Sequence, residues 1–223
     1  MAMRLEPGDH VCVFYGSDGE LAETAADFIA EGLRRGERCW YVPAGTEGSL
    51  VRAALRRRDV DVTADARRGA LEILAAADAY VVHGNFNPEA TMNVFSDAIE
   101  NALRDGFTGF LAGAEMSWAL TVEGGAELLI AYEALLRSLF STSRATGLCL
   151  YDRRRMPLQL VNGALVTHPV VRLGSGYHRN PLYDAADSSL PLANGGTVDG
   201  KLADLDRLVA AADRRARHHK PRR

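Results

Sequence analysis

Short apolar runs alternate with amphipathic segments along most of the chain, which is the pattern of strands and helices that follow one another in an α/β fold. The predicted strands are 10–15, 38–42, 69–74, 107–113, 147–151 and 170–173, with 170–173 expected to be the last. The predicted helices are 19–35, 46–58, 88–104 and 126–140, where apolar residues recur at helical spacing. Strands separated by helices pair in parallel through right-handed crossovers, so we expect a mostly parallel sheet with helices on both faces.

The composition changes near the end of the chain. We predict one globular domain over residues 1–185, a flexible linker over 186–198 and a basic amphipathic helix or tail over 199–223. The apolar side of that last helix comprises Leu202, Leu205, Leu208, Val209 and Ala212. The length of 223 residues and the 47% hydrophobic content suit one soluble domain with a short appendage.

Charge is distributed unevenly along the chain. Residues 201–223 hold eight Lys/Arg and three Asp/Glu, a net charge of +5. Because the whole chain has a net charge of −3, the first 200 residues have a net charge of −8. An acidic body argues against a nucleic-acid-binding domain, and direct nucleic-acid contact is left to the basic tail alone. We expect that tail to dock on protein, either the acidic body, a second copy in a homodimer or a partner, with simple disorder as the alternative.

The cellular compartment is indicated by two features, the three scattered cysteines and the lack of a long apolar run. Cys12, Cys39 and Cys149 form no CxxC pair, so neither a disulfide framework nor a zinc-finger pattern is indicated. No segment approaches the roughly 18 apolar residues that a membrane span needs. We therefore expect a cytoplasmic protein that makes no use of a membrane.

The first strand leads into a turn that resembles a damaged phosphate-binding loop. A working loop reads GxxxxGK[ST], with backbone amides around the phosphates and a lysine that neutralises their charge. Here the turn runs from Gly16 to Leu21, with Glu20 roughly where the lysine belongs and Asp18 beside it. The first 200 residues contain no lysine that could replace it. Ordinary ATP or GTP hydrolysis is therefore not expected, and a simpler explanation is that Ser17 or Asp18 only caps the following helix.

Several separate blocks of the sequence resemble one family, the MEDS domain, a sensory domain named for methanogens, methylotrophs and the repressor DcmR. The resemblance covers about residues 5–185. The blocks that carry it are 8–15, 31–37 with Tyr41, 113–118, 148–152, 167–169 and 180–183.

The resemblance implies a three-layer fold similar to RecA and KaiC that has lost its Walker motif. It also implies a sensor of small organic molecules, of the kind that is often joined to DNA-binding or kinase-type modules. No such output module is recognisable here, so the protein partner stays unassigned. The C-terminal amphipathic helix lies outside the part of the chain that the resemblance covers.

Ligands in open α/β sheets bind beyond the carboxyl ends of the strands. That rule selects Tyr15, Gly16, Glu115, Trp118 and Tyr151 as candidate ligand-binding residues. Their simpler explanations are that Trp118 fills the core and that Glu115 caps or pairs locally.

His10 and His168 lie inside the blocks that carry the resemblance and complete the candidate ligand site, although structural hydrogen bonds would also explain them. Nothing in the sequence requires a cofactor or a metal. The alternative metal-ligand set is His10, Cys12, His83, Cys149 and His168, with Glu115 as a further donor. The spacing of these residues does not demand a metal.

Catalytic motifs such as GxSxG, HExxH or GxGxxG after a strand are absent from the sequence, so we expect no enzyme. The leading hypothesis is a non-catalytic regulator that binds a small organic ligand at the strand ends and signals to a protein partner. The alternatives are a ligand-free interaction scaffold in a transcription, anti-sigma or kinase pathway, and a degenerate nucleotide-binding protein.

Overall fold

The computed structural model describes residues 3–79, 81–82, 85–183 and 196–218. The strands are β1 (His10–Tyr15), β2 (Arg38–Val42), β3 (Leu71–Ile73), β4 (Val81–Val82), β5 (Asn85–Phe86), β6 (Phe110–Glu115), β7 (Ala145–Asp152), β8 (Val170–Leu173) and β9 (Gly176–Arg179). The helices are α1 (Asp18–Arg34), α2 (Glu47–Arg56), α3 (Val62–Arg67), α4 (Ala76–Ala79), α5 (Pro88–Arg104), the 3₁₀ helix η1 (Met116–Thr121), α6 (Gly125–Thr142), α7 (Leu158–Thr167) and α8 (Val198–His218).

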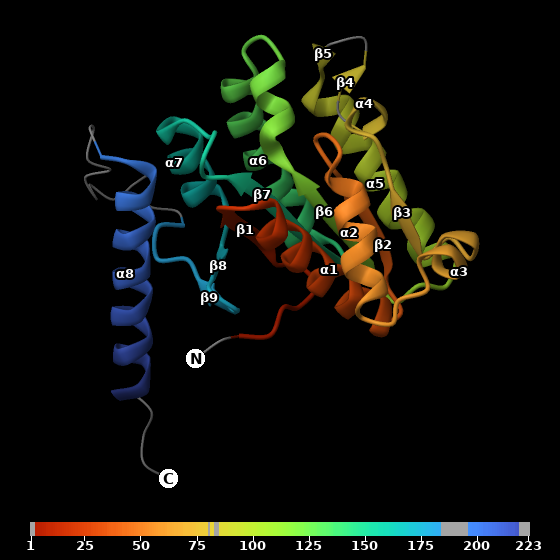
Figure 1. Cartoon of the computed structure of the whole chain (residues 1–223), viewed down its shortest axis with the longest axis horizontal. Coiled ribbons are helices and arrows are strands. Elements are labelled where there is room, and N and C mark those ends of the chain that lie inside the picture. The colour runs from red at the N-terminus through yellow and green to blue at the C-terminus, as the bar shows by residue number, and fades with distance from the viewer. Residues whose placement is uncertain (1–2, 80, 83–84, 184–195, 219–223) are drawn as a thin grey trace.

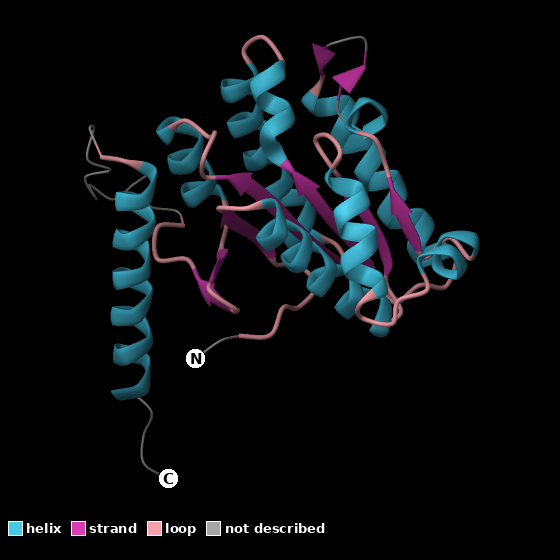
Figure 2. Cartoon of the chain, viewed as in Figure 1, coloured by secondary structure: helices cyan, strands magenta, loops and turns pink. Residues whose placement is uncertain are grey.

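Seven strands form one sheet in the order β3-β2-β6-β7-β1-β8-β9, and β4 pairs with β5 in a separate ribbon (Figure 2). Neighbouring strands of the sheet are parallel except β8 and β9, which form an antiparallel hairpin at one edge. The strand β7 stands between β1 and β6, so the strand that leads into the glycine turn does not pair with the one that ends at Glu115. The predicted class, a mostly parallel α/β sheet, is confirmed.

Helices cover both faces of the sheet because successive strand residues point to opposite sides. On one face, called here the α1 face, Val11 and Val13 of β1 pack under α1 and α2. On the other, the α6 face, Cys12 and Phe14 pack among residues of α5, α6 and α7. Figure 1 shows α1 and α2 in front of the sheet in this view. Each face therefore has its own buried cluster.

Two of the main helices begin at side chains that suit a helix N-terminus. The hydroxyl of Ser17 accepts a hydrogen bond from the backbone N–H of Glu20 and starts α1. The side chain of Asn87 does the same for α5, where Pro88 occupies the first helical position. The predicted capping role of Ser17 is thus observed.

The sequence misplaced or missed some elements. The strand expected at 107–113 is β6, which begins at Phe110, and 170–173 is not the last strand because β9 follows it. The helix α7 and the short elements α3, α4, β4, β5 and η1 were not predicted. Most of the predicted linker at 186–198 lies outside the described residues.

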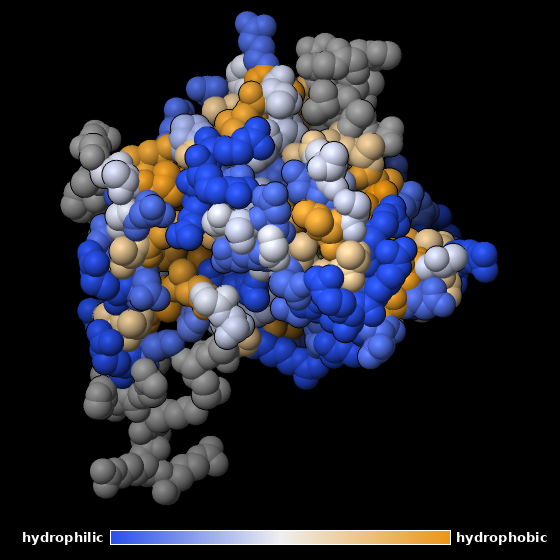
Figure 3. Space-filling view, viewed as in Figure 1, coloured by the Kyte–Doolittle hydropathy of each residue, from blue (hydrophilic) through white to orange (hydrophobic). Residues whose placement is uncertain are grey.

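The helix α8 lies alongside the β8–β9 hairpin (Figure 1). Leu205 is fully buried and Val209 nearly so, and both belong to the cluster of the α6 face. Ion pairs join Arg153 to Asp199 at 3.4 Å and His178 to Asp213 at 3.4 Å. In Figure 3, hydrophobic residues lie between α8 and the hairpin, and hydrophilic residues follow its outer side. The predicted C-terminal amphipathic helix is therefore confirmed, and it docks on the body.

Within the part of the chain that the structure describes, none of the helices combines the length and the apolar character that a bilayer crossing requires.

Candidate functional site

The glycine turn after β1 uses its own groups where a phosphate would bind. The backbone N–H of Gly16 donates to the Glu20 carboxylate at 2.8 Å, while the N–H of Glu20 donates to Ser17 at 3.2 Å. This reciprocal arrangement resembles a capping box, except that the glutamate accepts from the residue before the N-cap, and it occupies amides that a phosphate-binding loop keeps open. Glu20, which stands where the sequence comparison puts a loop lysine, therefore closes the turn.

Two arginines that follow β7 cover the same turn. A Cβ on Gly16 would lie 2.5 Å from Nη2 of Arg153, so the guanidinium rests directly on this glycine and would have to shift to admit a side chain. Arg154 donates to Asp18 at 2.7 Å and to Asp152 at 2.8 Å. The positive charge of Arg154 is thus shared with two acids of the protein itself.

A hydrogen-bonded group lies on the α1 face at the carboxyl ends of β1 and β6. Glu115 is 1% exposed and accepts from the Tyr15 hydroxyl at 2.9 Å. It also accepts from the backbone N–H of Ser117 at 2.9 Å and from its hydroxyl at 2.8 Å. Burial raises the pKa of Glu115 despite these bonds. The hydroxyl of Tyr41 is buried nearby without a hydrogen-bond partner among the described residues.

Trp118 lies in η1 and is 2% exposed. Its ring packs against that of Phe86, with ring centroids 4.5 Å apart. The geometry therefore fits the simpler explanation, in which Trp118 fills the core of the α6 face.

A second group of polar side chains is buried on the α6 face. Its centre is Glu133 of α6, which is 1% exposed. One oxygen of Glu133, Oε2, lies 3.3 Å from Nε2 of His10 and 3.4 Å from Nε2 of His168. Cys149 Sγ lies 3.2 Å from His10 Nε2 and 3.8 Å from Oε2 of Glu133. The other oxygen accepts from the hydroxyl of Tyr151 at 2.7 Å.

Packing determines how the two imidazoles lie. The ring centroids of His10 and His168 are 3.9 Å apart, and Phe140 lies 4.9 Å from His10. Gly147, which pairs with His10 across the sheet, has no side chain because a Cβ there would come within 2.9 Å of Cδ2 of His10. Burial lowers the pKa of both histidines to about 3, so both rings are neutral.

The predicted ligand-binding residues do not form a single pocket. Tyr15 and Glu115 meet on the α1 face, whereas the sheet separates them from His10, Tyr151 and His168 on the other face. Their roles toward a ligand stay predictions.

Part of the alternative metal set does come together. His10, Cys149 and His168 meet, and Glu133 completes the group. Cys12 instead directs its thiol to the carbonyl of Val170 at 3.7 Å, and Glu115 lies on the other face. His83 lies outside the described residues.

Glu133 was missed, although the sequence carries a signal for it. The helix 126–140 is strongly apolar, and Glu133 falls on the stripe that includes Leu129 and Leu136, both buried. A carboxylate on the buried stripe of a helix needs a partner inside the protein, because an unpaired buried charge is costly.

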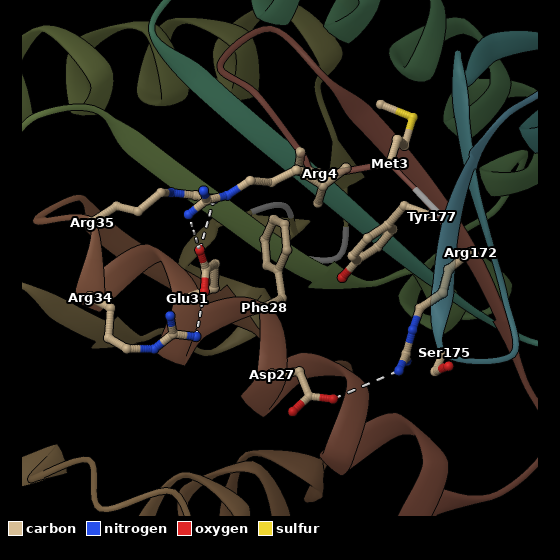
Figure 4. Close-up of a pocket in the computed structure, with 11 residues that line it drawn as sticks. Met3, Arg4, Asp27, Phe28, Glu31, Arg34, Arg35, Arg172, Ser175 and Tyr177 are labelled. Atoms are coloured by element: carbon tan, nitrogen blue, oxygen red, sulfur yellow. Dashed lines mark hydrogen bonds and ion pairs between the residues drawn. The ribbon is translucent and has the colours of Figure 1, made fainter. Parts of the chain in front are cut away.

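A groove of about 620 Å³ lies between α1 and the β8–β9 hairpin. Figure 4 shows the rings of Phe28 and Tyr177 facing its interior, with Arg172 reaching from the hairpin toward Asp27, 3.7 Å away. The lining includes four arginines and two acidic residues. The groove thus combines an aromatic floor with an excess of positive charge.

The carboxylate of Glu31 forms ion pairs with three of those arginines. Glu31 lies 3.2 Å from Arg4 and 3.8 Å from Arg35, and it also pairs with Arg34. Arg35 turns its other nitrogen to Glu37 at 2.7 Å. Because the guanidinium groups outnumber the carboxylates at the rim, an added anion would find donors there.

The sequence model of one family matches residues 9–169 of the chain. That family is described as the methanogen/methylotroph, DcmR sensory domain, or MEDS. A comparison with curated proteins finds no significant match.

Proposed function

The chain belongs to the MEDS family of sensory domains, and from this we propose that it is a non-enzymatic sensor which binds a small organic anion and signals to a protein partner. The observation that carries the proposal is the groove beside α1, with its aromatic floor and its surplus of arginines. Its volume falls within the roughly 300–1,000 Å³ that is typical of small-molecule sites.

The groove is a better ligand site than the carboxyl ends of the strands. At those ends Glu115 already accepts bonds from Tyr15 and Ser117, and Arg154 is already paired with two acids. In the groove, a ligand carboxylate could take a guanidinium of Arg4 or Arg34 without leaving a buried group unpaired. The apolar part of the ligand would then rest on Phe28 and Tyr177.

The β8–β9 hairpin connects the groove to α8. Arg172 and Tyr177 line the groove, while Leu173 and His178, one position along each strand, lie against α8. Arg172 also lines a smaller hollow of about 180 Å³ that Leu202 of α8 helps to enclose. A ligand that moves Arg172 would thereby change how α8 docks, and with it the exposed side of α8 that the partner would meet.

The ligand test is a thermal-shift and calorimetric screen with short-chain carboxylates, matched against the corresponding neutral alcohols and amides. At about 100 times its Kd a ligand stabilises the fold by about 2.7 kcal/mol, which corresponds to a shift in Tm of about 5–10 °C for a chain of this size. A variant that combines Arg4→Ala and Arg34→Ala should lose that shift. Arg67→Ala is the matched control because Arg67 is exposed on α3, away from the groove.

Two results would overturn the proposal. One is that none of the carboxylates stabilises the protein. The other is that a ligand binds equally well when Arg4 and Arg34 are both replaced by alanine, which would place it outside the groove. If α8 binds a partner with no dependence on any ligand, the scaffold function takes the place of the sensor.

A further inference from the structure

Four side chains that can bind metals converge inside the α6 face. His10, Glu133, Cys149 and His168 each offer one donor atom, and these four atoms lie within 4.8 Å of one another. They come from β1, α6, β7 and the residue that follows α7. All four are nearly or completely inaccessible to solvent.

Four of the six distances between the donors agree with tetrahedral coordination, and all six donor pairs lie within 4.8 Å. Metal bonds of about 2.0–2.3 Å to nitrogen, oxygen and sulfur place neighbouring ligand atoms about 3.3–3.6 Å apart at the tetrahedral angle. The observed separations are 3.2 Å for His10–Cys149, 3.3 Å for His10–Glu133, 3.4 Å for His168–Glu133 and 3.8 Å for Cys149–Glu133.

The hydrogen bonds of His168 leave a lone pair in the cluster. Its Nδ1 lies 2.8 Å from the carbonyl of Ala164, which can only accept, so Nδ1 carries the ring proton. In the neutral ring Nε2 is then a bare acceptor, and it faces another acceptor, the carboxylate of Glu133. Nε2 has no hydrogen-bond partner among the described residues although the side chain is fully buried. A cation between these atoms would satisfy both.

The outer contacts are those that metal ligands usually make. A ligating histidine commonly donates its second N–H to a backbone carbonyl, as His168 does to Ala164. Ligating carboxylates are commonly held by a further hydrogen bond, as Tyr151 holds the second oxygen of Glu133 at 2.7 Å.

Charge balance selects the type of ion. Two neutral imidazoles, one thiolate and one carboxylate carry a charge of −2, so a divalent cation gives a neutral buried complex. Nitrogen and sulfur ligands in tetrahedral positions favour zinc over magnesium or calcium, which prefer oxygen donors and higher coordination numbers.

We propose that His10, Glu133, Cys149 and His168 bind one zinc ion in a closed, structural site. The ion would tie the first strand of the sheet to α6, β7 and the end of α7. The competing explanation is a metal-free network in which the same four side chains contact one another directly.

The first experiment measures metal in the full-length protein, purified without a metal-affinity step. Inductively coupled plasma mass spectrometry should find about one zinc ion per chain after extensive dialysis. Removal of the metal with a chelator should lower Tm, and one equivalent of Zn²⁺ should restore it. In the apo protein, Co²⁺ should produce the visible bands of a tetrahedral site together with a thiolate-to-cobalt charge-transfer band.

Variants identify the ligands. Cys149→Ser should lose the charge-transfer band, whereas Cys12→Ser and Cys39→Ser, each altering another buried thiol, should keep it. Tyr151→Phe should weaken metal binding by about 10–100-fold, as is typical when an outer hydrogen bond to a ligand is removed. Tyr41→Phe is its matched control, because that buried hydroxyl lies on the opposite face and makes no hydrogen bond among the described residues.

The wild-type protein alone can refute the proposal, even if Cys149→Ser does not fold. Folded protein that contains only trace metal and binds neither Zn²⁺ nor Co²⁺ stoichiometrically would establish the metal-free network. A charge-transfer band that persists in folded Cys149→Ser and disappears in Cys12→Ser would place the ion elsewhere.

Discussion

Single residues of one strand serve two separate polar groups in this protein. His10 and Tyr15 both belong to β1, yet the sheet lies between their side chains, because residues an odd number apart point to opposite faces. The sequence indicated that both residues were candidates for a site. Assigning each of them to the right polar group requires knowing which face of the sheet each residue of β1, β6 and β7 points to.

Glu133 illustrates a limit of a different kind. Sequence reasoning concentrated on strand ends, whereas Glu133 lies in the middle of α6 and reaches the sheet from above. Its partners His10 and His168 are far from it in sequence. Only the packing of α6 and α7 on the sheet brings the three together, and that packing follows from tertiary contacts that no local pattern encodes.

The pair Asp152 and Arg154 leads to a prediction about pH. Burial by itself would raise the pKa of Asp152, but hydrogen bonds from Arg154 hold it below the ordinary value. A depressed pKa contributes stability that is present above the ordinary value of about 3.9 and is lost as the pH falls through the lower folded value. Arg154→Ala should therefore be less stable than the wild type near neutral pH, with a difference that vanishes in acid.

Urea denaturation between about pH 2 and pH 6 measures this difference. Arg155→Ala is the control, because Arg155 acts on Asp152 only through its charge and contributes less. A destabilisation of Arg154→Ala that is equal at every pH would contradict the electrostatic explanation. It would instead indicate lost packing of Arg154 over the ring of Tyr15, whose centroid lies 5.8 Å away.

At the scale of elements, clear periodicity gave correct boundaries. The strands 10–15 and 38–42 and the helix 88–104 were predicted with the ends that β1, β2 and α5 have. The helix α7 was missed because its sequence, LQLVNGALVT, is apolar on nearly every side and so shows no helical stripe. The strand β9 was missed because GYHR is short and half polar, and only pairing with β8 makes it a strand.

The docking of α8 leads to a prediction at the same scale. Leu205 is fully buried and Leu208, on the same helix, is 38% exposed. Leu205→Ala should reduce the free energy that holds α8 on the body by about 2–5 kcal/mol, because it leaves a cavity. Leu208→Ala changes the helix propensity by the same amount without opening a cavity. Since a peripheral helix can open without the rest of the fold, the loss should appear as local opening of α8.

Amide hydrogen exchange distinguishes local from global opening. In Leu205→Ala the amides of α8 should exchange faster while those of β1 and β7 stay protected. Leu208→Ala should exchange like the wild type. Equal loss of protection in α8 and in the central strands of Leu205→Ala would mean that α8 is part of the cooperative core.

For the whole molecule, the sequence predicted the architecture better than the site. Alternating strand and helix patterns suffice for a parallel sheet with two covered faces, because crossover rules leave few other topologies. The charge asymmetry has no simple counterpart in α8, because Arg214 and Arg215 are exposed but so are Asp204 and Asp206, while Lys201 is buried. The groove was not foreseen, because it is formed by the N-terminal segment, α1 and a hairpin that the sequence did not reveal.

The closed glycine turn leads to a prediction about nucleotide binding by the whole molecule. Three features act together: Glu20 holds the N–H of Gly16, Arg153 covers Gly16, and Asp18 binds Arg154. Magnesium with ATP or GTP should therefore bind with a Kd weaker than about 1 mM in calorimetry. Glu20→Lys frees the amide and supplies a cation, yet binding should still fail because Arg153 stays in place and Asp18 keeps its charge. Tight binding by Glu20→Lys would mean that a single carboxylate had closed the site, and tight binding by the wild type would mean that the turn opens.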